Sequence, residues 1–187
     1  VSPQCWTLLP FGKTLLVGAF DGVYEINGNQ GRRISDGFVF SLHRSRQDPM
    51  RVFAGMRDGL KTLYFDGGTW REEGRIEGMN QEVRHFYETP KGQLWLTDYF
   101  SGLLLVDLSK GYTPRPPIMR FDTLHGLPPA DRVVAFPTDK GLRFATLQGI
   151  FLFDEARQRF YRDTTLVEGL SNPKIGLFSA SWDGQGN

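Results

Sequence analysis

The sequence predicts an all-β fold, a β-propeller with about four four-stranded blades and the first strand of a fifth. One observation is a short apolar unit that repeats along the chain at intervals of 37 to 47 residues. Repeats of about this length, made of short apolar runs divided by turns, are typical of propeller blades. The other is the content of 22 Gly and 11 Pro in 187 residues, which is above average and indicates many turns.

A glycine that begins the third strand anchors each repeat unit. These anchors, 37, 43 and 47 residues apart, are Gly22, Gly59, Gly102 and Gly149. An apolar run ends three or four residues before each anchor and predicts second strands at 15–18, 52–55, 94–97 and 142–145. More polar segments predict outer edge strands, which must resist pairing with other chains, at 32–35, 69–76, 118–121 and 159–162.

The whole chain, residues 1–187, is predicted to be a partial propeller, a fragment of a larger one. The expected blades span approximately residues 5–35, 38–76, 82–121 and 131–163, and a lone strand is expected at 174–181. The chain starts without an initiator Met or a signal-peptide pattern, so we expect it to begin inside a longer gene product. An open row of blades exposes apolar faces at its ends, which predicts self-association; compact closure of four blades is the alternative.

Repeated positions are first assigned structural roles. The anchor glycines are expected to adopt positive φ or to allow close backbone approach. We assign Leu16, Phe53, Trp95 and Phe144 to one repeat position that packs between neighbouring blades. Trp70 lies in a predicted outer strand and is a candidate for a surface-stacking aromatic, with a packing role as the alternative.

Composition excludes several functional classes. The formal net charge is +1, so no broad field favours nucleic acid or an anionic membrane surface. Cys5 is the one cysteine, which rules out an internal disulfide or a cysteine metal cluster. The sequence contains no run of 18 apolar residues, so no membrane helix is predicted. The three histidines, His43, His85 and His125, lack metal-ligand spacing, so no metal or cofactor is predicted.

No catalytic motif is recognisable, so the segment is not predicted to be an enzyme. The segment Gly12-Lys13-Thr14 lacks the upstream glycine of a phosphate-binding loop, because position 7 is Thr7. No G-x-S-x-G nucleophile motif occurs. A propeller lyase or hydrolase remains a lesser alternative.

The last third of the chain carries a more specific motif. Residues 121–127 (FDTLHGL) recur as 161–164 (YRDT) with 168–172 (EGLSN), and 178–187 (FSASWDGQGN) follow. Residues 93–97 (QLWLT) precede Gly102-Leu103. This pattern resembles the two-component regulator propeller repeat, in which an aromatic-led strand precedes G-L-S-x-N, D-x-x-G-N, L-W-x-G-T and G-L elements. The fourth unit departs from it, because Arg143-Phe144-Ala145 stands in place of the tryptophan element.

The resemblance implies a function. Propellers of that family form the extracytoplasmic sensor region of membrane-bound signalling proteins, usually ahead of a histidine kinase or a nucleotide cyclase. It therefore implies a periplasmic location and signal perception, but it does not identify the signal. The partner that we expect is a small-molecule or oligosaccharide-like signal. A protein-interaction or dimerisation scaffold without a small-molecule ligand is the alternative.

Propeller geometry predicts the face that would bind a ligand. The turns between second and third strands lie on the same face as the segments leading into each first strand, and loops on a rigid scaffold commonly carry binding residues. The predicted ligand-binding residues are Phe20, Asp21, Arg57, Asp58, Tyr99, Phe100, His125, Gln148 and Asn172. Ordinary exposed turn residues are the alternative for each.

Overall fold

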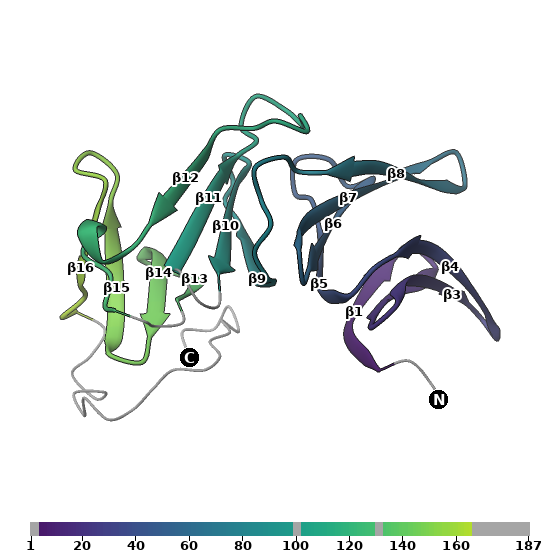
Figure 1. Cartoon of the computed structure of the whole chain (residues 1–187), viewed down its shortest axis with the longest axis horizontal. Coiled ribbons are helices and arrows are strands. Elements are labelled where there is room, and N and C mark those ends of the chain that lie inside the picture. Colours follow the sequence, from purple (N-terminus) through teal and green to yellow (C-terminus); the bar gives the residue numbers. More distant parts are fainter. Residues whose placement is uncertain (1–3, 99–101, 130–132, 166–187) are drawn as a thin grey trace.

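The computed structural model describes residues 4–98, 102–129 and 133–165, and Figure 1 shows their arrangement. They form sixteen β-strands and one three-residue 3-10 helix, η1 (Thr123–His125). The strands make four antiparallel four-stranded sheets, so the predicted all-β propeller class is confirmed. The strand expected at 174–181 lies outside the described residues. These residues include no helix with the length and apolar character that a membrane span requires.

Each sheet is one blade, with strands A to D following one another in chain order. Blade 1 consists of β1 (Cys5–Phe11), β2 (Thr14–Ala19), β3 (Gly22–Asn27) and β4 (Gln30–Asp36). Blade 2 consists of β5 (Val39–Arg44), β6 (Arg51–Met56), β7 (Gly59–Asp66) and β8 (Thr69–Arg75). Blade 3 consists of β9 (Val83–Glu88), β10 (Gln93–Asp98), β11 (Gly102–Asp107) and β12 (Ile118–Phe121). Blade 4 consists of β13 (Val134–Thr138), β14 (Gly141–Thr146), β15 (Gly149–Asp154) and β16 (Arg159–Arg162).

The blades follow one another around the molecule, from blade 1 on the right of Figure 1 to blade 4 on the left. The A strands are innermost, because β1 contacts β5, β5 contacts β9 and β9 contacts β13. Antiparallel order gives the molecule two distinct faces. The B–C face carries the B–C turns and the links from each D strand to the next A strand. The A–B face carries the A–B and C–D turns.

Apolar side chains from neighbouring blades form the core. Phe53 of blade 2 clusters with Leu94 and Leu104 of blade 3. Between blades 3 and 4, the Trp95 ring meets the Phe144 ring edge-on at a centroid distance of 4.9 Å. Inter-blade packing therefore holds the array together, as expected for sheets that bury both faces.

Trp70 is part of this core, and its interpretation as a surface-stacking residue is wrong. It is 8% exposed, and its ring lies 4.7 Å from the Phe11 ring of blade 1. Its indole nitrogen donates a hydrogen bond of 3.1 Å to Glu25. An outer strand can still bury a large aromatic where the next blade covers it.

Strand pairing also corrects one predicted equivalence. The residues paired with the four anchor glycines are Ala19, Met56, Asp98 and Thr146. Counting back three positions from each gives Leu16, Phe53, Trp95 and Arg143. Arg143, not Phe144, therefore holds the repeat position. The predicted equivalence rested on aromatic character, whereas the true one depends on distance from the turn.

The anchor glycines are required for two different reasons. Gly59 adopts φ +120°, and a Cβ there would lie 2.8 Å from the Met79 carbonyl oxygen. Gly22 has no left-handed backbone, but a Cβ there would approach the Ser35 carbonyl oxygen to 2.2 Å. Close backbone approach thus occurs at both anchors, whereas positive φ occurs at Gly59 and not at Gly22.

The C–D connections differ in length, and the long connection of blade 3 covers the seam between blades 2 and 3. In blade 3 the connection, residues 108–117, reaches back over blade 2, where Glu77 N donates to Pro114 O at 2.8 Å. The Arg51 guanidinium of blade 2 lies 4.5 Å from the centroid of the Tyr112 ring in this loop. In blade 4 the connection is only residues 155–158, and an open cleft remains between blades 3 and 4.

Candidate functional site

Six of the nine predicted ligand-binding residues are described, and they lie in B–C turns or in the link before blade 4. Phe20, Arg57, Asp58 and Gln148 are exposed, and Asp21 and His125 are half-buried. Tyr99, Phe100 and Asn172 lie outside the described residues.

Most of these polar residues have partners within their own blade or link. Asp21 accepts a 2.7 Å hydrogen bond from the Tyr24 hydroxyl, which raises the pKa of Tyr24. Asp58 pairs with Arg75 at 2.7 Å. The hydrogen bond from His125 to Asp122 lowers the pKa of Asp122 and belongs to the cap of the 3-10 helix. These contacts order the turns locally.

Phe20 differs, because it belongs to an aromatic cluster that spans blades 1 and 2. We define the aromatic cluster as Trp6, Phe20, Phe38 and Phe40. The Phe38 ring is central, 4.9 Å from the Phe20 ring, 4.5 Å from Phe40 and 5.8 Å from Trp6. Phe20 is 57% exposed and Trp6 is 44% exposed, so the cluster presents aromatic surface to solvent.

A β-bulge and a link position the cluster. The pairing of β1 with β2 is irregular between Cys5 and Thr7, and the intervening Trp6 reaches the rings of blade 2. Phe38 lies in the link before β5, held by a 3.1 Å hydrogen bond from Arg57 N to Phe38 O. From blade 3, the Arg84 guanidinium lies 4.3 Å from the Phe40 ring centroid, a favourable cation–π geometry.

Sequence reasoning missed three members of this cluster. Phe38 and Phe40 flank the fully buried Val39, so the alternation of Phe-Val-Phe was the available signal. The bulge at Trp6 breaks the period-two pattern of its strand and left no signal of its own.

His43 has a structural role between blades 2 and 3. Its Nε2 lies 2.9 Å from Glu88, which also accepts hydrogen bonds from the Ser45 hydroxyl at 3.1 Å and Arg46 N at 2.6 Å. Burial would raise the pKa of Glu88, but these donors lower it overall. Among the residues described, no group of three or more His, Cys, Asp and Glu side chains is arranged to hold a metal ion.

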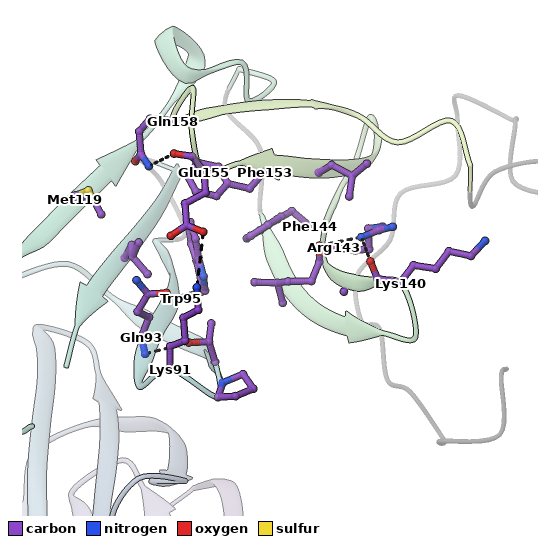
Figure 2. Close-up of a pocket in the computed structure, with 16 residues that line it drawn as sticks. Lys91, Gln93, Trp95, Met119, Lys140, Arg143, Phe144, Phe153, Glu155 and Gln158 are labelled. Atoms are coloured by element: carbon purple, nitrogen blue, oxygen red, sulfur yellow. Dashed lines mark hydrogen bonds and ion pairs between the residues drawn. The ribbon is translucent and has the colours of Figure 1, made fainter. Parts of the chain in front are cut away.

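The open seam between blades 3 and 4 forms a concave site on the A–B face (Figure 2). This inter-blade cleft has a volume of about 630 Å³. Its walls are mainly apolar and include Trp95, Leu105 and Met119 of blade 3 and Leu142, Phe144 and Phe153 of blade 4. At its mouth, Lys91 Nζ of blade 3 lies 4.0 Å from Glu155 Oε2 of blade 4.

Comparisons with known proteins identify the fold. No protein-family model matches the chain, and no curated protein matches it significantly. Among solved structures, the extracellular domain of a proposed hybrid two-component system from B. thetaiotaomicron matches with a TM-score of 0.69 and 16% identity. A second such domain from this organism matches with a TM-score of 0.63 and 11% identity. A proposed phosphatase from the same organism matches with a TM-score of 0.57 and 12% identity.

These matches cover most of this chain but only part of each neighbour. They span 86%, 88% and 86% of this chain, and 21%, 25% and 45% of the two extracellular domains and the phosphatase, respectively. The predicted resemblance is confirmed at the level of the fold. The chain therefore shares the β-propeller fold of the extracellular domains of two-component systems.

Proposed function

We propose that this chain is part of the extracytoplasmic sensor propeller of a two-component-type signalling protein. In this proposal it binds a small-molecule or oligosaccharide-like signal on its B–C face. Two lines of support meet here: the fold shared with extracellular two-component domains, and the solvent-exposed aromatic cluster on the face predicted for binding. The aromatic cluster is the observation that carries the proposal.

The chemistry of the cluster suits such a ligand. Exposed rings offer apolar faces for stacking against the C–H surface of a sugar or another flat ligand. Charged groups nearby, including Arg57 in the adjoining turn, can hydrogen-bond to hydroxyl groups at the edge of the ligand. A few polar groups around an apolar platform are the usual composition of a small-molecule site.

The proposal is tested by isothermal titration calorimetry with a panel of oligosaccharides. We expect a binding oligosaccharide to lose about tenfold in affinity in Trp6→Ala and in Phe20→Ala, because each variant removes a stacking surface. Tyr161→Ala is the matched control, since Tyr161 is a 52% exposed aromatic on β16 of blade 4. Equal losses in the control, or unchanged affinity in both cluster variants, would remove the B–C face as the binding surface.

A scaffold function is the second candidate, and a separate observation favours it. Leu8 of β1 is 62% exposed, as is expected of apolar residues at a protein–protein contact. If no panel member binds while Leu8→Asp abolishes self-association, the scaffold replaces the sensor as the better explanation.

A further inference from the structure

The inter-blade cleft is mainly apolar inside, and Lys91 and Glu155 lie close together at its mouth. We propose that it binds a free α-amino acid with a large apolar side chain. The side chain would enter between blades 3 and 4, with the carboxylate at Lys91 and the ammonium group at Glu155. The cleft lies on the A–B face, so this inference does not depend on the proposed sensor function of the B–C face.

The walls of the cleft favour an apolar body. Leu142 and Phe153 are only half-buried, and Met119 is 39% exposed. Their counterparts in the better-covered seam between blades 2 and 3 include Leu94, which is fully buried. An apolar group filling the cleft would remove this surface from water, and burial of apolar surface is the main driving force for such binding.

The aromatic rings of the cleft do not offer a platform for a sugar. Trp95 is only 4% exposed, and its ring makes edge-on contacts with Phe144 and Phe153 at centroid distances of 4.9 and 5.1 Å. Because the ring is enclosed, a ligand can be inserted beside it but cannot stack broadly on it. This separates the inter-blade cleft from the exposed aromatic cluster on the other face.

The charges of Lys91 and Glu155 at the mouth of the cleft favour a ligand with both an anionic and a cationic group. Lys91 and Glu155 are 73% and 71% exposed, and their 4.0 Å separation is longer than a direct hydrogen bond. Such an exposed pair contributes little to stability, so both groups are available to a ligand. A simple anion would meet the charge of Glu155, and a simple cation that of Lys91. A zwitterion complements both.

Other charged groups near the cleft are directed elsewhere. Arg143 Nε donates to Asp163 at 2.6 Å, and its Nη1 donates to Lys140 O at 3.0 Å. Figure 2 shows the Lys140 side chain extending away from the labelled cleft residues of blade 3. The turn that carries Glu155 is held by a 2.7 Å hydrogen bond from Gln158 Nε2 to Glu155 O, which fixes one side of the mouth.

The ligand test compares four related probes by calorimetry on the intact chain. L-phenylalanine is the zwitterion, 3-phenylpropionate the anion, phenethylamine the cation, and N-acetyl-L-phenylalanine amide the neutral form. We expect L-phenylalanine to bind at least about tenfold more tightly than each of the others, since only it satisfies both charges. Equal binding of all four, or no binding of L-phenylalanine, overturns the proposal.

The site is tested with surface variants, which should fold normally because both charged residues are exposed. Lys91→Ala and Glu155→Ala should each weaken L-phenylalanine about tenfold and leave the binding of the neutral probe unchanged. Lys110→Ala is the matched control, an exposed lysine of blade 3 that does not line the cleft. Trp6→Ala should also leave L-phenylalanine binding unchanged. Loss in either control, or no loss in either cleft variant, places the amino acid elsewhere and overturns the assignment.

Discussion

Arg143 occupies the position that the other blades fill with Leu16, Phe53 and Trp95. It is 5% exposed, and its partner Asp163 is 1% exposed. Asp163 also accepts hydrogen bonds from the backbone N and hydroxyl of Thr165. Burial would raise the pKa of Asp163, but Thr165 and Arg143 lower it overall, so the carboxylate stays charged. Blade 4 thus replaces an apolar contact with a buried ion pair.

Removing one partner of this pair should lower the free energy of unfolding much more than removing both partners. Arg143→Met strands a buried carboxylate and should lower the free energy of unfolding by about 3–5 kcal/mol, whereas Arg143→Met with Asp163→Leu should recover most of that loss. Urea denaturation at pH 7 measures both. Because the folded pKa of Asp163 is depressed, the pair stabilises at neutral pH, and this stabilisation is lost as pH falls through that pKa. Additive losses in the double variant would contradict the coupling.

Residue type alone could not reveal this substitution. The sequence shows Arg143 and Phe144 side by side, and the aromatic residue is the natural match for Trp95. Only the count from the B–C turn, made visible by the pairing of Thr146 with Gly149, shows which of the two is equivalent. A partner 20 residues away, Asp163, likewise carries no local signal.

Strand β7 has a glycine at its start and another just after its end, and the two are required for different reasons. It begins at Gly59, where φ is +120° and the Met79 carbonyl is close. It is followed by Gly67, where φ is +55° and no atom lies within 4 Å of the position that a Cβ would take. Both glycines adopt positive φ, but only the first is also crowded. The start of the strand therefore leaves no room for a side chain, whereas its end needs only a left-handed turn.

The two glycines form a matched pair of substitutions. Gly67→Ala should cost about 1 kcal/mol, from the left-handed conformation alone. Gly59→Ala should cost more, about 2–3 kcal/mol, because the backbone must also move away from Met79. Chemical denaturation of the two variants in parallel measures the difference. Equal losses would mean that the close approach to Met79 relaxes without cost.

Element-level prediction succeeded where a pattern repeats and failed where one unit deviates. All four polar outer strands are present, although the connections that precede them range from two to ten residues. The aromatic cluster depends on which residues occupy the irregular pairing near the start of each first strand. This irregularity is present in blades 1, 2 and 3, but it places Trp6 in blade 1 and Phe40 in blade 2, whereas blade 3 has Arg84 and His85 there. Its exposed surface therefore could not be derived from the repeat.

At the scale of the whole molecule, the outward side of blade 1 has no blade packed against it among the described residues. Leu15 and Ile26 are half-buried there, whereas their counterparts in blade 2, Val52 and Leu63, are fully buried. The fold class followed from the sequence, but the extent of this surface and the inter-blade cleft depend on packing between blades. No single repeat encodes that packing.

This surface supports the prediction that the chain self-associates. Multi-angle light scattering should give a mass above 21.2 kDa that rises with concentration, because apolar surface of this kind is buried by association. Ile26→Lys should lower that mass toward the monomer, and Lys110→Glu, a charge change in the C–D loop of blade 3, should not. A monomeric mass at every concentration would contradict self-association and favour compact four-blade closure.

The ten-residue connection of blade 3 has a consequence for the room left between the blades. Residues 108–117 cover the seam between blades 2 and 3. The four-residue connection of blade 4 leaves the seam between blades 3 and 4 uncovered. The pocket that remains beneath the long connection has a volume of about 300 Å³, against about 630 Å³ for the uncovered cleft. The length of one surface connection can therefore change the room that a seam offers to a ligand, while the strands on either side keep their pairing.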